Sequence, residues 1–202
     1  YRVAWEFNQM LPREQKKFRV LNLSYQYDWS GFTPPRTPDN MRKVFPKGTP
    51  DAFRARIVEQ EVIAKNEKAL LLVGSVHAFT KYHMPELGVN SDDFCDYDDG
   101  LLGNRLFKKY PEKVFNILLH YPFYSKPNET RGQRCPGDGK IEELMALNDD
   151  MPVGFDLVGS PMCRIADNIF FQTCYRGFTC EQIFDGYIFL KPFDKLLGCT
   201  ID

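Results

Sequence analysis

The chain has 202 residues, of which 43% are hydrophobic and 14% aromatic, enough for one domain with a sizeable core. Its 26 Lys and Arg nearly balance 27 Asp and Glu, so the net charge is −1. A balanced charge gives no support for nucleic-acid binding or for an acidic tail. No apolar stretch approaches the ~20 residues that a transmembrane helix needs. We therefore expect a small-molecule or peptide substrate, and the oligomeric state stays open.

The order of apolar and amphipathic segments predicts an α/β domain. Residues 1–7 are typical of the middle of a helix, and the chain does not begin with methionine, so we expect an upstream portion of the domain to precede it. Helical periodicity follows at residues 51–68, 100–110 and 140–147. Short apolar runs predict strands at residues 18–23, 69–73, 114–119, 153–158 and 186–190. This alternation predicts one domain over residues 1–202 with a mostly parallel sheet of about five strands and helical crossovers.

Histidines follow two of the predicted strands. His77 comes three residues after Gly74, where the apolar run 69–73 ends, and His120 directly follows the run 114–119. The carboxyl ends of parallel strands meet at one edge, which is where ligands bind in open α/β sheets. A neutral imidazole there can bind a metal ion or accept a proton. A histidine that only hydrogen-bonds within a turn is the structural alternative for both residues, and His83 is typical of a loop.

Three further residues complete the predicted site. Asp156 lies inside an apolar strand, where an unpaired carboxylate is costly, so it either pairs with a cation or caps a backbone group. Gly74 allows the backbone to approach a ligand closely. Tyr121 belongs to the aromatic residues near the histidines, which either line a flat apolar pocket or pack in the core. We expect Gly74 and Tyr121 to contact a bound cofactor.

The cysteines leave two readings open. None of them forms a C-x-x-C pair, which disfavours a zinc ribbon. They are either free, partly buried thiols or form one to three disulfides in an exported protein, with Cys174 and Cys180 as the easiest local pair. The six are Cys95, Cys135, Cys163, Cys174, Cys180 and Cys199. No nucleophile elbow, P-loop or dinucleotide fingerprint is present in the sequence.

The segment Gly74-Ser75-Val76-His77 resembles the G-x-x-H motif of the TIKI / TraB / erythromycin-esterase / ChaN-like superfamily. Similar stretches are found at residues 7–12, 18–23, 28–29, 51–57 and 184–188. Members carry two such motifs, or one and a later histidine, as metal ligands, as a catalytic base or around haem. Only the motif at Gly74 and His77 maps here, and Asn22 stands where the family has an aspartate. The resemblance implies that the first motif lies upstream of Tyr1.

Three functions follow as expectations. The first is a hydrolase of the esterase or metallopeptidase kind, in which His77, His120 and Asp156 are catalytic and a divalent metal binds to His77 and His120. The second is a haem- or metal-binding protein of the ChaN type. The third is a non-catalytic interaction domain. The resemblance favours a bacterial cell-envelope or secreted location.

Overall fold

A computed structural model describes residues 1–87, 94–98, 100–121, 123–124, 133–134, 136–167 and 178–196. The chain divides into two compact units, Tyr1–Ala69 and Leu70–Asp202, and each is described by itself. The single domain expected from the sequence stays a prediction. In the described ranges, no helix combines the length and the apolar character needed to span a bilayer.

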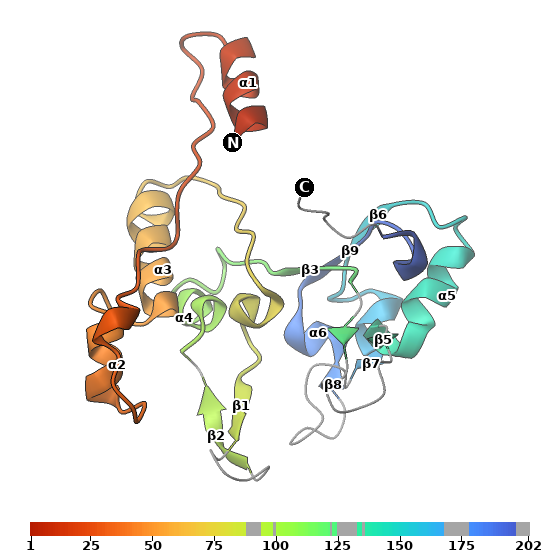
Figure 1. Ribbon diagram of the computed structural model, residues 1–202. Coiled ribbons are helices and arrows are strands. Elements are labelled where there is room, and N and C mark those ends of the chain that lie inside the picture. Colours follow the sequence, from red (N-terminus) through yellow and green to blue (C-terminus); the bar gives the residue numbers. More distant parts are fainter. Residues whose placement is uncertain are drawn as a thin grey trace. The chain divides into compact units, whose positions relative to one another are not determined.

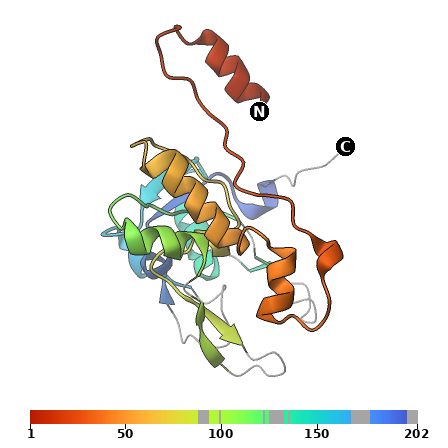
Figure 2. The same cartoon turned by 90° about the vertical axis from the view of Figure 1, so that its left-hand side faces the viewer.

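The first unit is helical. Its elements are α1 (Arg2–Met10), the 3₁₀ turn η1 (Trp29–Gly31), α2 (Pro38–Val44), α3 (Pro50–Val58) and the π-helix η2 (Glu59–Ile63). Both α2 and α3 begin with a proline that follows an N-cap threonine. The fixed φ and missing N–H of proline suit the first helical position. An extended segment separates α1 from α2 and α3 (Figures 1 and 2).

The second unit contains a three-stranded sheet in the order β3-β9-β6 (Figure 1). Strand β9 (Gly186–Phe189) runs parallel to β3 (Ile117–Leu119) and antiparallel to β6 (Val153–Asp156). Its helices are α4 (Leu102–Lys109), α5 (Lys140–Ala146) and α6 (Cys180–Ile183), with 3₁₀ turns η3 (Ser75–Ala78), η4 (Pro136–Gly139), η5 (Pro161–Arg164) and η6 (Phe193–Lys195). Two-stranded pairs join β1 (Met84–Leu87) to β2 (Phe94–Asp98), β4 (Phe123–Tyr124) to β5 (Gln133–Arg134), and β7 (Ala166–Asp167) to β8 (Phe178–Thr179).

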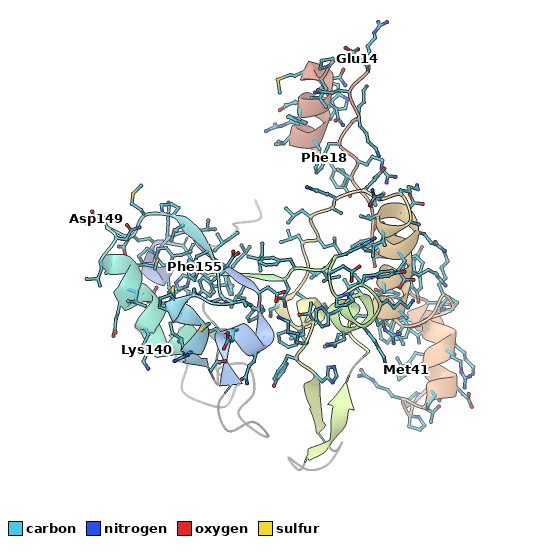
Figure 3. The ribbon with its side chains drawn as sticks, turned by 180° about the vertical axis from the view of Figure 1, so that it is seen from behind. Glu14, Phe18, Met41, Lys140, Asp149 and Phe155 are labelled. Atoms are coloured by element: carbon cyan, nitrogen blue, oxygen red, sulfur yellow. The ribbon has the colours of Figure 1, made fainter. Side chains whose placement is uncertain are left out.

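One face of the β3-β9-β6 sheet forms the core of the second unit. Leu118, Tyr187 and Phe189 are buried on this face, together with Ile141 and Met145 of α5. Figure 3 labels Lys140 at the start of α5, Asp149 beyond its end, and Phe155 on β6. Because α5 presents its apolar residues four positions apart, one stripe of this helix packs on the sheet.

The predicted five-stranded parallel sheet is wrong. Runs 114–119, 153–158 and 186–190 do contain β3, β6 and β9, but β6 is antiparallel to its neighbour. Runs 18–23 and 69–73 form no strand. The side chain of Asn8 accepts from the backbone N–H of Phe18 and donates to its carbonyl, so both backbone groups are already bonded outside any ladder. Apolar runs predict burial, but pairing needs a neighbouring strand, and no strand in the described part of the chain pairs with these two runs.

The three predicted helices that follow residue 50 are confirmed. Residues 51–68 contain most of α3 and all of η2, residues 100–110 contain α4, and residues 140–147 contain α5. Their amphipathic spacing places Val58, Leu106 and Ile141 in buried positions.

Candidate active site

His77 lies in a short loop, residues 75–82, that we name the His77 loop. The loop begins with η3, where the backbone N–H of His77 donates to the carbonyl of Gly74 over 2.9 Å. His77 is half-buried, whereas Phe79 and Thr80 are buried. The loop therefore packs its later residues inward and leaves part of His77 at the surface.

Helix α4 holds the His77 loop from one side. The side-chain amide of Asn104 donates to the carbonyl oxygens of Thr80, at 2.8 Å, and Tyr82, at 2.9 Å. The neighbouring Gly103 lies so close that a Cβ atom would come within 2.6 Å of the carbonyl oxygen of Ala78. Helix and loop backbones touch here because residue 103 has no side chain.

Asn116, just before β3, holds the same loop from a second side. Its amide nitrogen donates to the carbonyl oxygens of Ala78, at 3.0 Å, and Ile183, at 2.9 Å. Its amide oxygen accepts from the backbone N–H of Asp185 over 2.8 Å. Asn116 is buried, so these bonds form away from water and join the loop, the end of α6 and the start of β9.

A third contact joins Lys81 to Asp185. The Lys81 ammonium lies 2.6 Å from one carboxylate oxygen of Asp185, and the other oxygen accepts from the backbone N–H of Asn116 at 3.0 Å. Asp185 is buried, while the Lys81 side chain is 41% exposed. The buried carboxylate is thus both paired and hydrogen-bonded, which offsets the cost of removing it from water.

His120 lies at the other end of β3. Asn116 precedes the strand and His120 follows it, so the two are about 13 Å apart at a rise of about 3.3 Å per residue. The His120 side chain is fully enclosed and stacks on Phe193, with ring centroids 4.1 Å apart. Its two ring nitrogens face the Tyr187 hydroxyl, at 2.6 Å from Nδ1, and a Glu142 carboxylate oxygen, at 3.3 Å from Nε2.

The partners of His120 define its tautomer. An ionised carboxylate only accepts hydrogen bonds, so Nε2–H donates to Glu142 and Nδ1 accepts the Tyr187 hydroxyl proton. The same Glu142 oxygen accepts from the backbone N–H of Phe193 at 2.8 Å. Burial lowers the pKa of His120 below the usual 6.5, although Glu142 acts in the opposite direction. The imidazole is therefore neutral at neutral pH.

The remaining predicted site residues lie apart from this network. The strand register places Asp156 opposite Gly186, which is opposite Ile117, so Asp156 faces away from the core side on which His120 lies. Asp156 is exposed and has no ion pair or hydrogen bond with the described residues. Tyr121 is 55% exposed, and His83 is exposed. The parallel edge that was expected to bring His77, His120 and Asp156 together is absent from the described sheet.

Gly74 has an ordinary backbone conformation. Its φ is −61°, and an added Cβ would meet only the ring of His77, at 3.6 Å. The backbone therefore does not require glycine at this position. The predicted approach of Gly74 to a ligand stays a prediction, and the close contact between helix and loop backbones is made by Gly103.

The predicted metal and haem ligands do not fit one bound group. Both ring nitrogens of His120 already have partners, and its ring is enclosed, so neither can coordinate a metal without breaking this network. His77 belongs to a loop bound at the opposite end of β3. The described residues contain no cluster of three or more His, Cys, Asp or Glu suited to a metal ion.

The cysteines are only partly covered by the described residues. Cys163 is a buried free thiol, and Cys180 is also buried. Cys135, Cys174 and Cys199, and the side chain of Cys95, lie outside what the structure describes. The predicted Cys174–Cys180 pair therefore stays a prediction.

A shallow cavity of about 500 Å³ lies in the first unit beside α1. Its lining comprises Tyr1, Arg2, Ala4, Trp5, Asn8, Phe18 and Val20. The lining contains no histidine and no carboxylate, so none of the predicted catalytic or metal-binding residues lines this cavity.

Sequence reasoning missed Asn104, Asn116 and Asp185, which bind the His77 loop through hydrogen bonds and an ion pair. A signal was present for Asn116, since a lone amide inside the apolar run 114–119 needs buried partners. No signal in the sequence pointed to Asn104, because asparagine is common on exposed helix surfaces.

No protein-family model, no curated protein and no solved structure matches this chain. The resemblance described above therefore rests on the quoted residues alone.

Proposed function

We propose that this chain is a hydrolase in which His77 is the general base that activates water. The observation that supports the proposal is the construction of the His77 loop. Buried amides of Asn104 and Asn116 and the Lys81–Asp185 ion pair hold four neighbouring residues of this loop. A catalytic group needs such support because a displaced base loses most of its rate advantage.

The proposed reaction is hydrolysis of a carbonyl ester or amide. The imidazole of His77 takes a proton from water while the water oxygen forms a bond to the carbonyl carbon. The tetrahedral adduct then expels the alcohol or amine, and the imidazolium returns the proton to this leaving group. Water is the only reactant besides the ester or amide. Since His77 and His120 do not fit a common metal ion, no step is assigned to a metal.

The resemblance to the TIKI / TraB / erythromycin-esterase / ChaN-like superfamily is a second support, because its G-x-x-H histidine is the one that maps onto His77. His120 has a different proposed role. Its enclosed ring hydrogen-bonds to Tyr187 and Glu142 and lies out of reach of a substrate. Asp156 and Tyr121 have no part in the proposed chemistry.

The test is a hydrolysis screen with nitrophenyl esters of increasing chain length and matching anilides. The wild-type chain is compared with His77→Ala and with the control His83→Ala, an exposed histidine six residues further on. We expect the wild type and His83→Ala to hydrolyse at least one substrate of the screen, and His77→Ala to show no turnover of it. Equal rates in all three proteins, or no rate above buffer in the wild type, would refute it.

A further inference from the structure

The second face of the β3-β9-β6 sheet is apolar and exposed. Alternation along β3 places Phe115, Ile117, Leu119 and Tyr121 on this face, with exposed fractions of 57, 41, 43 and 55%. The register adds Ile188, opposite Leu119, and alternation along β9 adds Leu190. We name these six residues the open face.

The open face lies on the opposite side of the sheet from the core. Leu118 and His120 alternate with the open-face residues of β3 and are buried. Within β3 itself, Leu118 is buried on the core side and Ile117 and Leu119 lie on the open face, so the strand is apolar on both sides, a pattern typical of strands that are covered on both faces. One cover is present in the second unit, and no described residue of that same unit supplies the other.

We propose that a second copy of this chain covers the open face, so that the protein forms a twofold-symmetric dimer by sheet-on-sheet packing. The six side chains expose on the order of 500 Å² of apolar surface, toward the upper end for a single patch on a monomer. Two copies would bury about 1,000 Å² in total, which is the lower bound for a specific interface.

The shape of the open face suits pairing with itself. β3 carries a ridge of large side chains, whereas β9 carries Gly186 opposite Ile117, and β6 carries Gly154 opposite Ile188. The Phe115 ring already lies over Gly186, because an added Cβ there would come within 2.9 Å of this ring. The low region is therefore around Gly154 on β6. A twofold axis lets the β3 ridge of each copy enter the low region of the other.

Charge also favours a second copy over a partner with another surface. Among the residues that the register places on this side of the described sheet, only Asp156 is charged, and it lies at the end of β6. An apolar centre with a charge at its rim is the usual arrangement of a homodimer interface. The face offers no charge pattern that would select a basic or an acidic partner.

The experiment is sedimentation velocity of the full chain across micromolar to submillimolar concentrations. The proposal expects a reversible monomer–dimer equilibrium, and Leu119→Lys is expected to weaken dimerisation at least roughly tenfold by burying a charge at the interface. The control Trp5→Lys changes an exposed apolar residue of α1, 64% exposed in the first unit, and is expected to leave the dimer intact.

Two results would overturn the proposal. One is a wild-type chain that stays monomeric over the whole concentration range. The other is a dimer that Trp5→Lys disrupts and Leu119→Lys does not, which would assign association to α1. Circular dichroism checks that each variant is folded. If Leu119→Lys does not fold, Tyr121→Lys replaces it, because Tyr121 lies beyond the end of β3 and is 55% exposed.

Discussion

The side-chain amide of Asn116 donates to the carbonyl oxygen of Ala78 over 3.0 Å, and this bond joins the start of β3 to the residue that follows His77. The same amide group also bonds Ile183 and Asp185. One buried side chain therefore joins three segments that are far apart in the sequence. If His77 is the base, its position depends on a residue that cannot itself touch the substrate.

Replacing Asn116 by alanine is expected to destabilise the second unit by about 2–4 kcal/mol, because buried carbonyl and N–H groups lose their partners. Urea unfolding followed by circular dichroism measures this change. The matched control is Asn148→Ala, an exposed asparagine after α5 whose stability effect is expected to be within about 0.5 kcal/mol. Equal effects of the two substitutions would contradict the role given to Asn116.

Gly103→Ala is expected to destabilise the chain by about 2 kcal/mol or more. Alanine favours a helix by about 1 kcal/mol over glycine, but here its Cβ would collide with the backbone carbonyl of Ala78. Gly74→Ala is the control, since a Cβ there meets only the His77 ring at ordinary contact distance. Thermal unfolding of both variants should show a fall in melting temperature for residue 103 alone.

Removal of Asp185 and removal of its partner Lys81 are expected to have unequal effects. Asp185→Ala leaves the buried N–H of Asn116 without its acceptor, whereas Lys81→Ala removes a side chain that is 41% exposed. We expect Asp185→Ala to cost about 1–2 kcal/mol more in the free energy of unfolding. A larger loss of stability from Lys81→Ala would contradict this expectation. It would show that the Lys81–Asp185 ion pair contributes more to the free energy of unfolding than the bond from the Asn116 backbone N–H does.

The pKa of His120 makes stability depend on pH. Because this pKa is lowered in the folded state, the unfolded chain binds more protons once the pH falls below about 6.5. The free energy of unfolding is therefore expected to decrease from about pH 7 to about pH 5. Urea unfolding at several pH values measures the slope.

Two variants test whether this slope belongs to His120. His120→Asn is expected to be less stable overall but to show a smaller change with pH over the same range. His83→Ala is expected to keep the wild-type slope, because His83 is exposed. An unchanged slope in His120→Asn would assign the pH dependence to other groups.

The sequence predicted local structure better than pairing. Apolar spacing located α3, α4 and α5, and three of its five apolar runs contain β3, β6 and β9. It could not predict that β6 would be antiparallel, since direction depends on the connections between strands. Residues 69–73 have the composition of a buried strand, yet Leu70 and Leu72 are about nine-tenths exposed. The composition of a segment indicates how much free energy its burial would release. Whether the segment is buried as a strand depends on a partner strand beside it.

The candidate site was predicted in part. The run ending at Gly74 drew attention to His77, but the predicted strand-end position alone could not separate His77 from His120. Burial separates them, because His77 is half-buried and His120 is enclosed. The supporting amides are distant in sequence from His77 and became evident only from their hydrogen bonds.

The decisive measurement for a catalytic His77 is kcat/KM of the wild type, His77→Ala and His83→Ala on the best ester found in the screen. We expect a loss of about 10²–10⁴-fold for His77→Ala, the usual contribution of a general base, and no loss for His83→Ala. Unchanged kcat/KM in a folded His77→Ala protein would contradict the proposal that the His77 loop is built to hold a catalytic base.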